Sequence, residues 1–80
     1  MAKLPSLTAR KVVRALKRAG FIEDRQKGSH LILMHKGTKA RTVVPVHASR
    51  TLKEPLLRAI IRDANLSVEE FVELLRDHHF

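Results

Sequence analysis

The spacing of the apolar residues changes at Gly20, and this change limits the folds that are open to the chain. Before Gly20 the apolar residues recur at helical spacing: Val12, Val13, Leu16 and Ala19. Thr8 precedes this stripe and is a residue type that caps a first helical turn. The sequence therefore predicts a helix from about Thr8 to Ala19 that ends with Gly20 in the left-handed conformation.

After Gly20 the chain consists of short segments that are separated by glycine-containing turns. Residues 21–26, 30–35 and 41–44 are predicted to be strands, and Pro45 ends the third of them. Lys27-Gly28-Ser29 is a tight turn, and residues 36–40 have the length of a hairpin loop, with Gly37 for its turn. These features predict a three-stranded antiparallel meander.

Two further helices follow a connection over residues 46–53. Pro55 suits the first turn of a helix, and Asn65 suits its left-handed C-terminus. Ser67 and Glu70 form a capping box that opens a short helix over about residues 68–76. We predict an α+β fold in the order α-β-β-β-α with an extra C-terminal helix, and helices packed on one face of the sheet. Residues 1–80 are predicted to form a single domain with its core over about residues 7–66.

The charge of the chain is concentrated in its first half. The 80 residues carry a net charge of +8. Residues 1–41 hold eleven basic and two acidic side chains, whereas residues 42–80 hold five basic and six acidic ones. Such a field attracts polyanions, so nucleic acid is favoured over the alternative of a solvated basic face. The basic residues are spread over several elements, which argues against a membrane surface. There is no cysteine and no apolar run that could span a bilayer, so we expect a cytoplasmic protein.

Five histidines are candidates for chemistry. His30 follows the Gly28 turn, with Arg25 and Lys27 close in sequence, and an imidazole can exchange a proton near neutral pH. RNA offers a metal-free reaction, because its 2′-hydroxyl attacks the adjacent phosphorus once a base removes the proton. From the residues alone, however, a strand histidine satisfied by a hydrogen bond or by solvent is favoured. His47 is a second candidate acid or binding group for which a structural role is favoured, and His35 is expected to contact phosphate or solvent; His78 and His79 lie in the tail.

Other kinds of site find little support. The histidines lack metal-ligand spacing, so we predict no metal and no cofactor. Of the three phenylalanines, Phe21 and Phe71 fall on core positions and Phe80 is terminal. Exposed strand aromatics for stacking bases are therefore not expected, and recognition should rely on phosphate contacts and shape, with strong salt dependence.

Four segments taken in order resemble the HicA toxins, the mRNA-cleaving members of type II toxin–antitoxin systems. They are Leu16-Lys17-Arg18-Ala19-Gly20-Phe21, Arg25-Gln26-Lys27-Gly28-Ser29-His30, Val44-Pro45-Val46-His47 and Leu56-Leu57-Arg58-Ala59-Ile60-Ile61. The resemblance covers roughly Leu7 to Leu75. It implies a fold like a double-stranded-RNA-binding domain, metal-independent cleavage of mRNA with His30 as the catalytic residue, and neutralisation by a HicB antitoxin that covers the active site. The chain departs from the family in having Glu54-Pro55-Leu56-Leu57 at the start of its second helix, where Pro-Gly-Thr-Leu is common.

With the resemblance included, the sequence predicts an endoribonuclease toxin with mRNA and a HicB-type antitoxin as partners. His30 is the predicted general base or acid. The predicted RNA contacts are Arg25, Lys27, Gly28, Ser29, Lys36, Lys39 and Arg41. A non-catalytic RNA-binding module of the same fold is the alternative, and a DNA-binding antitoxin-like protein is disfavoured because no helix-turn-helix spacing is evident.

Overall fold

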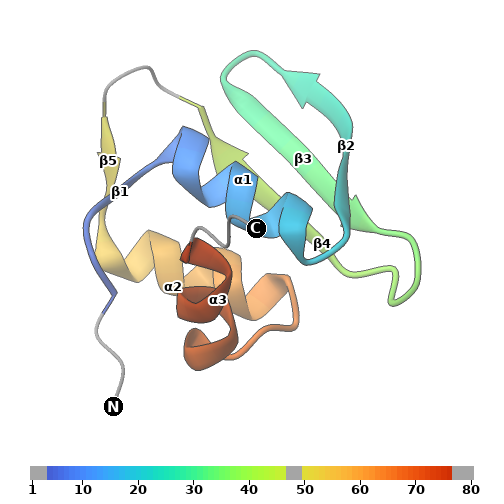
Figure 1. The fold of residues 1–80 in the computed structure, drawn as a ribbon. Helices are drawn as coiled ribbons and strands as arrows, with labels where there is room; N and C mark the ends of the chain where they lie inside the picture. Colours follow the sequence, from blue (N-terminus) through green and yellow to red (C-terminus); the bar gives the residue numbers. More distant parts are fainter. Residues whose placement is uncertain (1–3, 47–49, 77–80) are drawn as a thin grey trace.

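A three-stranded antiparallel sheet with helices against it forms the centre of the molecule (Figure 1). The computed structural model describes residues 4–46 and 50–76. The sheet has the order β2-β3-β4. Its strands are β2 (Phe21–Lys27), β3 (His30–His35) and β4 (Arg41–Pro45), and the helices are α1 (Ala9–Arg18), α2 (Glu54–Asp63) and α3 (Val68–Leu75). The predicted α+β fold with its α-β-β-β-α order and extra helix is confirmed.

Local signals in the sequence set the ends of the helices. Thr8 caps α1, since its hydroxyl accepts the backbone N–H of Lys11, and Gly20 follows the helix with φ of 101°. Asn65 has φ of 64° and completes a Schellman-type end of α2, in which the N–H groups of Asn65 and Leu66 donate to the carbonyls of Arg62 and Ile61. The capping box that was predicted at Ser67 and Glu70 opens α3. These ends confirm the predicted helix boundaries to within one or two residues.

The central strand β3 faces the helices with every second side chain. Leu31 and Leu33 point inward and are buried, whereas His30, Ile32 and Met34 lie on the other face, because neighbouring residues of a strand point to opposite sides. We call the face of the sheet turned away from the helices the outer face. Across the strands, His30 pairs with Lys27 of β2 and with Pro45 of β4.

The core lies between the inner face of the sheet and the helices α1 and α2. Its fully buried members come from every layer: Val12, Leu16, Leu33, Val44, Leu57, Ile60 and Ile61. Among the described residues, one buried polar side chain joins this set: the hydroxyl of Thr42 in β4 donates a hydrogen bond to the carbonyl of Ile60 in α2 at 3.0 Å. This bond fixes α2 against the sheet at a place where an unpaired hydroxyl would be costly.

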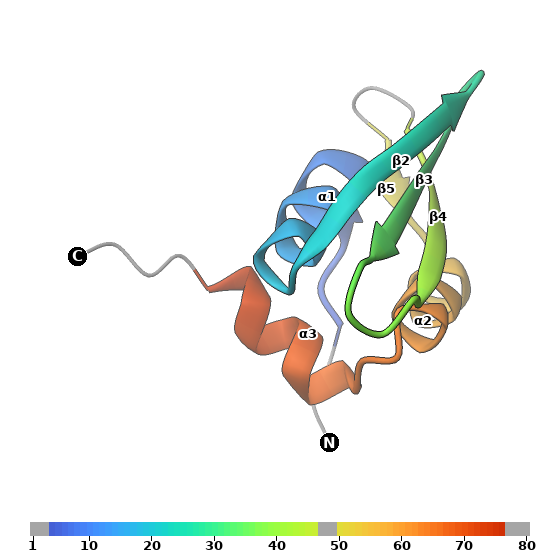
Figure 2. The ribbon, with the colours of Figure 1, turned by 90° about the vertical axis from the view of Figure 1, so that its right-hand side faces the viewer.

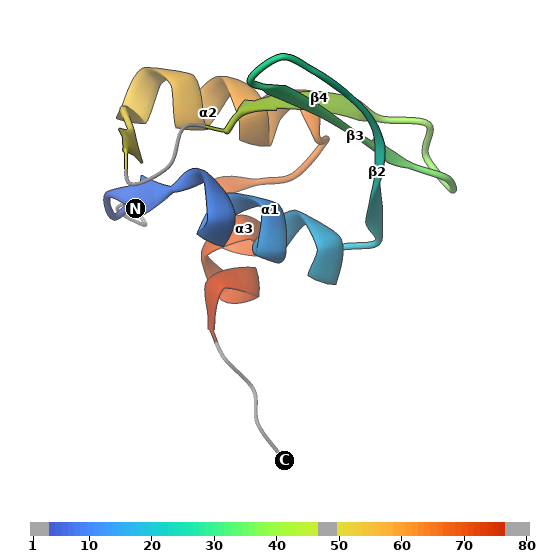
Figure 3. The ribbon, with the colours of Figure 1, turned by 90° about the horizontal axis from the view of Figure 1, so that it is seen from above.

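Helix α3 covers α1 on the side away from the sheet (Figure 3). Its Phe71 is 0% exposed, so the helix closes the core and is not a surface addition. Arg18 at the end of α1 binds the C-terminal end of α3, because its guanidinium donates to the carbonyls of Leu74 and Arg76. A cation at this position satisfies carbonyls that a helix leaves unpaired at its C-terminus.

Two features were not predicted from the sequence. Leu7–Thr8 (β1) and Thr51–Leu52 (β5) form a small antiparallel ladder, where a lead-in and an irregular connection were expected. Two residues on each side are too few to produce a periodic pattern. In the loop between β3 and β4, where Gly37 was assigned to the turn, the residue with left-handed backbone is Lys39, with φ of 65°.

Replacing Phe71 by alanine tests whether α3 is integral to the fold. Truncating a fully buried phenylalanine typically costs about 3–5 kcal/mol of unfolding free energy. We expect Phe71→Ala to lower the urea midpoint by a corresponding amount or to unfold the protein, whereas Glu69→Ala on the exposed side of the same helix should change stability by less than about 0.5 kcal/mol. Equal midpoints for the two variants would show that α3 is not docked.

Candidate nucleic-acid interface

His30 lies exposed at one end of the outer face. It is the first residue of β3 and is preceded by the two-residue turn Gly28–Ser29. Figure 2 shows this turn projecting beyond the helices α1 and α2. The imidazole is therefore open to a large ligand, on a strand whose inward neighbour Leu31 is anchored in the core.

The backbone around His30 is held firmly although the side chain is free. Gly28 has φ of 55° as the first residue of the turn, the conformation that a type II′ hairpin turn requires there. The side-chain amide of Gln26 donates to the carbonyl of Gly28, and the N–H of Val46 donates to the carbonyl of Ser29 at 2.6 Å. Apart from Gly28 and its two chain neighbours, no described residue has an atom within 4 Å of the place where a Cβ on Gly28 would stand, so the backbone is open to a ligand at this point.

Three of the predicted RNA-contacting cations share the outer face with His30. Lys27 is its direct cross-strand partner, and Arg25 lies opposite Ile32 in the next row. Arg41 lies opposite Met34, further along the sheet, where its guanidinium is 3.8 Å from the carboxylate of Asp24. All three side chains are exposed, so the row of cations follows one face of the sheet away from His30.

The same face has an aliphatic centre. Ile22 and Val43 are each 41% exposed, and Ile32 and Met34 lie between them on β3. Phe21 and Phe71 are buried as predicted, so no phenylalanine in the described part of the chain stands on this face. The outer face thus combines exposed cations with aliphatic surface and offers no ring for base stacking.

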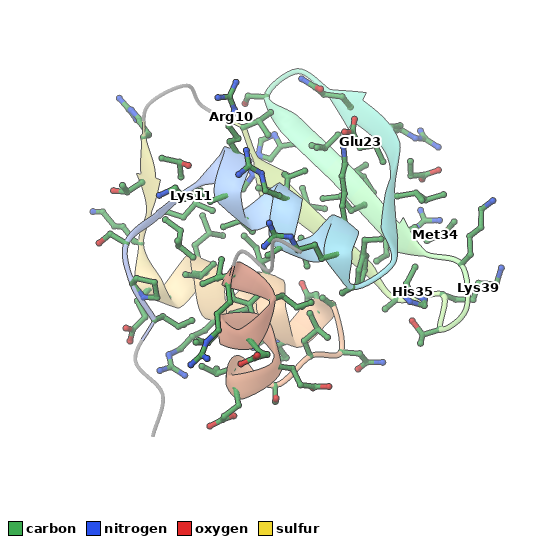
Figure 4. The ribbon with its side chains drawn as sticks, in the orientation of Figure 1. Arg10, Lys11, Glu23, Met34, His35 and Lys39 are labelled. Carbon is green, nitrogen blue, oxygen red and sulfur yellow. The ribbon has the colours of Figure 1, made fainter. Side chains whose placement is uncertain are left out.

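Lys36 and Lys39 are not part of the His30 end. They lie in the loop that joins β3 to β4, at the opposite end of β3, which at about 3.3 Å per residue is roughly 17 Å away. Figure 4 shows Lys39 beside His35 at that end of the sheet. A ligand that contacts these lysines as well as His30 must extend along the sheet.

His35 has a structural role, contrary to the expectation that it contacts phosphate or solvent. Its Nδ1 accepts the backbone N–H groups of Gly37 and Thr38 at 3.0 and 3.1 Å, and its ring meets Phe21 edge to face. A Cβ on Gly20 would stand only 2.8 Å from Nε2, so this glycine leaves room for the ring. His35 thereby joins the end of α1 to the loop that carries Lys36 and Lys39.

A further group of cations was not assigned to the site from the sequence. Arg10, Arg14 and Lys17 of α1 line a groove of about 370 Å³ together with Val13, Leu31 and Val46. The groove lies on the inner side of the sheet end that carries His30, since Leu31 follows His30 and Val46 is bonded to Ser29. The sequence could have indicated this group, because Arg10 and Arg14 have i, i+4 spacing on a helix without acidic residues.

Three further points concern the other histidines, metal binding and membrane spanning. His47 lies outside the described residues, as do His78 and His79. Within residues 4–46 and 50–76 no three His, Asp or Glu side chains are grouped so that they could hold a metal ion. None of the described helices has the length and apolar character needed to cross a membrane.

The fold and the basic, histidine-bearing sheet end define a small α+β domain that is suited to binding a polyanion. The family described as HicA toxin of bacterial toxin–antitoxin matches residues 9–66, which is more than half of the chain. The chain therefore belongs to the HicA toxin family of bacterial toxin–antitoxin systems, and membership implies an antitoxin as partner. A search among curated proteins found no match.

The different settings of His30 and His35 predict that replacing His35 costs much more stability than replacing His30. His35→Ala removes the acceptor of two N–H groups and the ring that packs on Phe21, so we expect a loss of about 1–3 kcal/mol in unfolding free energy. His30→Ala should change it by less than about 0.5 kcal/mol, because the side chain is exposed. Urea denaturation of both variants checks this, and a larger loss for His30→Ala would contradict the assignment.

Proposed function

We propose that this toxin cleaves mRNA without a metal ion, with His30 as the general base or acid. The observation that carries the proposal is the exposed imidazole at an open turn, with an ammonium group, Lys27, directly across the strand pair. A base and a cation held side by side on a rigid sheet are two of the groups that the reaction uses. Family membership adds that the chain is a toxin.

The chemistry follows from the RNA itself. His30 takes the proton from a ribose 2′-hydroxyl, whose oxygen then forms a bond to the adjacent phosphorus. The bond from phosphorus to the 5′-oxygen breaks, and this oxygen takes up a proton, which leaves a 2′,3′-cyclic phosphate and a 5′-hydroxyl. Lys27 stabilises the negative charge that develops on the phosphate oxygens. His47 stays a candidate for the second proton transfer on sequence grounds alone.

The other residues predicted to contact RNA bind its backbone. Arg25 and Arg41 bind phosphates along the outer face, and Lys36 and Lys39 bind the backbone where it leaves the sheet at the far end. The open backbone at Gly28 and Ser29 lets the RNA approach closely. Since most of these contacts are to phosphates, the affinity should depend strongly on salt and little on sequence.

A HicB-type antitoxin is the proposed neutralising partner, and the cytoplasm, where mRNA is found, is the proposed site of action. The outer face supports such a partner because its exposed Ile22 and Val43 share that face with the cations Arg25, Lys27 and Arg41. A protein with an apolar centre and acidic rim would cover His30 and exclude RNA. We also propose that residues 1–80 form a single domain of this family.

Cleavage of a structureless RNA in EDTA by the wild type and by His30→Ala tests the proposal. We expect the variant to bind RNA like the wild type and to cleave it about 100- to 10,000-fold more slowly, the usual contribution of a general acid or base. The wild-type products should end in 2′,3′-cyclic phosphate, and induced expression of His30→Ala should no longer arrest growth.

Glu69→Ala is a suitable control, because it removes an exposed side chain of α3, which packs against α1 on the side away from the sheet, and this variant should cleave RNA at the wild-type rate. If the wild type and His30→Ala bind RNA equally and both leave it intact, the catalytic role is wrong and the chain is an RNA-binding module. If EDTA abolishes cleavage by the wild type, the metal-independent mechanism is wrong.

A further inference from the structure

The groove between α1 and the end of the sheet has the composition of an anion-binding site. Three cations, Arg10, Arg14 and Lys17, line it, and the rest of its lining is aliphatic, with no acidic side chain. Arg10 projects from the N-terminal half of α1 (Figure 4), and Arg14 follows it one turn later on the same face of the helix. The volume of about 370 Å³ lies within the range of about 300–1,000 Å³ that is usual for ligand pockets.

The cations of α1 are placed unfavourably for the helix alone. Arg10 and Lys11 stand in the first turn, at the positive end of the helix dipole, and no acidic residue stands there. Arg10 and Arg14 are also like charges at i and i+4, which destabilises a helix. Helix stability therefore does not account for this arrangement, whereas an anion in the groove would relieve the repulsion.

Arg10 and Arg14 differ from the two cations that follow them in α1, because Lys17 and Arg18 are bound within the protein. Lys17 forms an ion pair with Glu23 of β2, and Arg18 binds the carbonyl groups at the end of α3. Neither Arg10 nor Arg14 forms an ion pair or a side-chain hydrogen bond with any residue in the described part of the chain. Both side chains are exposed and line the groove, so their guanidinium groups are available to a ligand.

We infer that this groove binds the phosphodiester backbone of RNA through Arg10 and Arg14, as a continuation of the site at His30. The inference rests on the proposed function for the identity of the strand. The groove and His30 share one end of the sheet: His30 stands on its outer face, Leu31 lines the groove on its inner face, and Ser29 is bonded to Val46 between them. An RNA strand whose phosphate is attacked beside His30 contacts Arg10 and Arg14 as it passes around this end of the sheet.

RNA is favoured over an acidic protein segment by the form of the site. Guanidinium groups bind phosphates and carboxylates alike through two parallel hydrogen bonds, so the distinction rests on the aliphatic lining, which suits the sugar rings between phosphates. An acidic protein partner finds a broader surface on the outer face, where aliphatic side chains and cations are both exposed. Protein binding is therefore the competing outcome of the test.

The test is the salt dependence of binding to an oligonucleotide that cannot be cleaved. A fully 2′-O-methylated, structureless RNA lacks the attacking hydroxyl, so binding is measured apart from chemistry. We expect Arg10→Gln/Arg14→Gln to bind at least tenfold more weakly at low salt. The slope of log Kd against log salt concentration should fall by about 1.4, because each phosphate contact to a single strand contributes about 0.7.

The matched control is Arg58→Gln/Arg62→Gln on α2. It removes two exposed arginines at the same i, i+4 spacing, but these pair with Glu54 and Asp63. It should leave the slope within 0.3 or so of the wild-type value, less than half of one phosphate contact. Thermal denaturation should show that Arg10→Gln/Arg14→Gln is at least as stable as the wild type, since repulsion within α1 is removed.

The outcomes separate this inference from the proposed function. If Arg10→Gln/Arg14→Gln keeps the wild-type affinity and slope, the inference is wrong, whether or not the wild type cleaves RNA. The inference is also wrong if the variant keeps its RNA affinity and loses affinity for the antitoxin. If the wild type never cleaves RNA but the variant loses binding and slope as expected, the groove assignment stands and only the catalytic proposal fails.

Discussion

The register of β3 is the constraint on which the fold and the site both depend. As the central strand, β3 pairs with both of its neighbours, and its inward residues Leu31 and Leu33 lie in the core. A slip by one residue would expose both leucines, at a cost of about 1.5–3 kcal/mol each, and would turn His30 into the core. The turn at Gly28–Ser29 and the bond from Val46 to Ser29 hold the register on both sides. Burial of the leucines therefore also exposes the imidazole.

The cations of α1 divide into two groups with different roles. Lys17 and Arg18 bind within the protein and fix α1 to β2 and to α3. The segment that supplies α3 lies beyond residues 9–66, yet Phe71 is fully buried against the same core. The added helix thus supports α1 from behind and leaves the groove lined by Arg10 and Arg14 on a fixed scaffold. Holding a charged surface rigid reduces the conformational entropy that the protein loses when a ligand binds.

Local signals predicted most of the fold, whereas long-range placement did not follow from them. Thr8, Gly20, Asn65 and Ser67 each act through neighbouring backbone, so their effect was readable from sequence. The β1–β5 ladder depends on residues more than forty positions apart, and two residues on each side give no pattern. For the site, the position of His30 beside Lys27 follows from a two-residue turn. The structural role of His35 does not, because it requires Gly20, Phe21 and the β3–β4 loop to meet around one ring.

His30 on the outer face and the groove on the inner face lie at the same end of the sheet. Together they argue for single-stranded RNA as the substrate. On the proposed path, the backbone passes from the outer face at His30, around the turn at Gly28–Ser29, to the groove on the inner face. A duplex is stiff, with a persistence length for DNA of about 50 nm, so it reaches both faces only if the whole turn enters one of its grooves. A single strand can follow this path, and it also exposes the 2′-hydroxyl to His30 in conformations that a helix does not allow. On the proposed path, the charge pattern therefore favours single-stranded RNA without favouring a particular sequence.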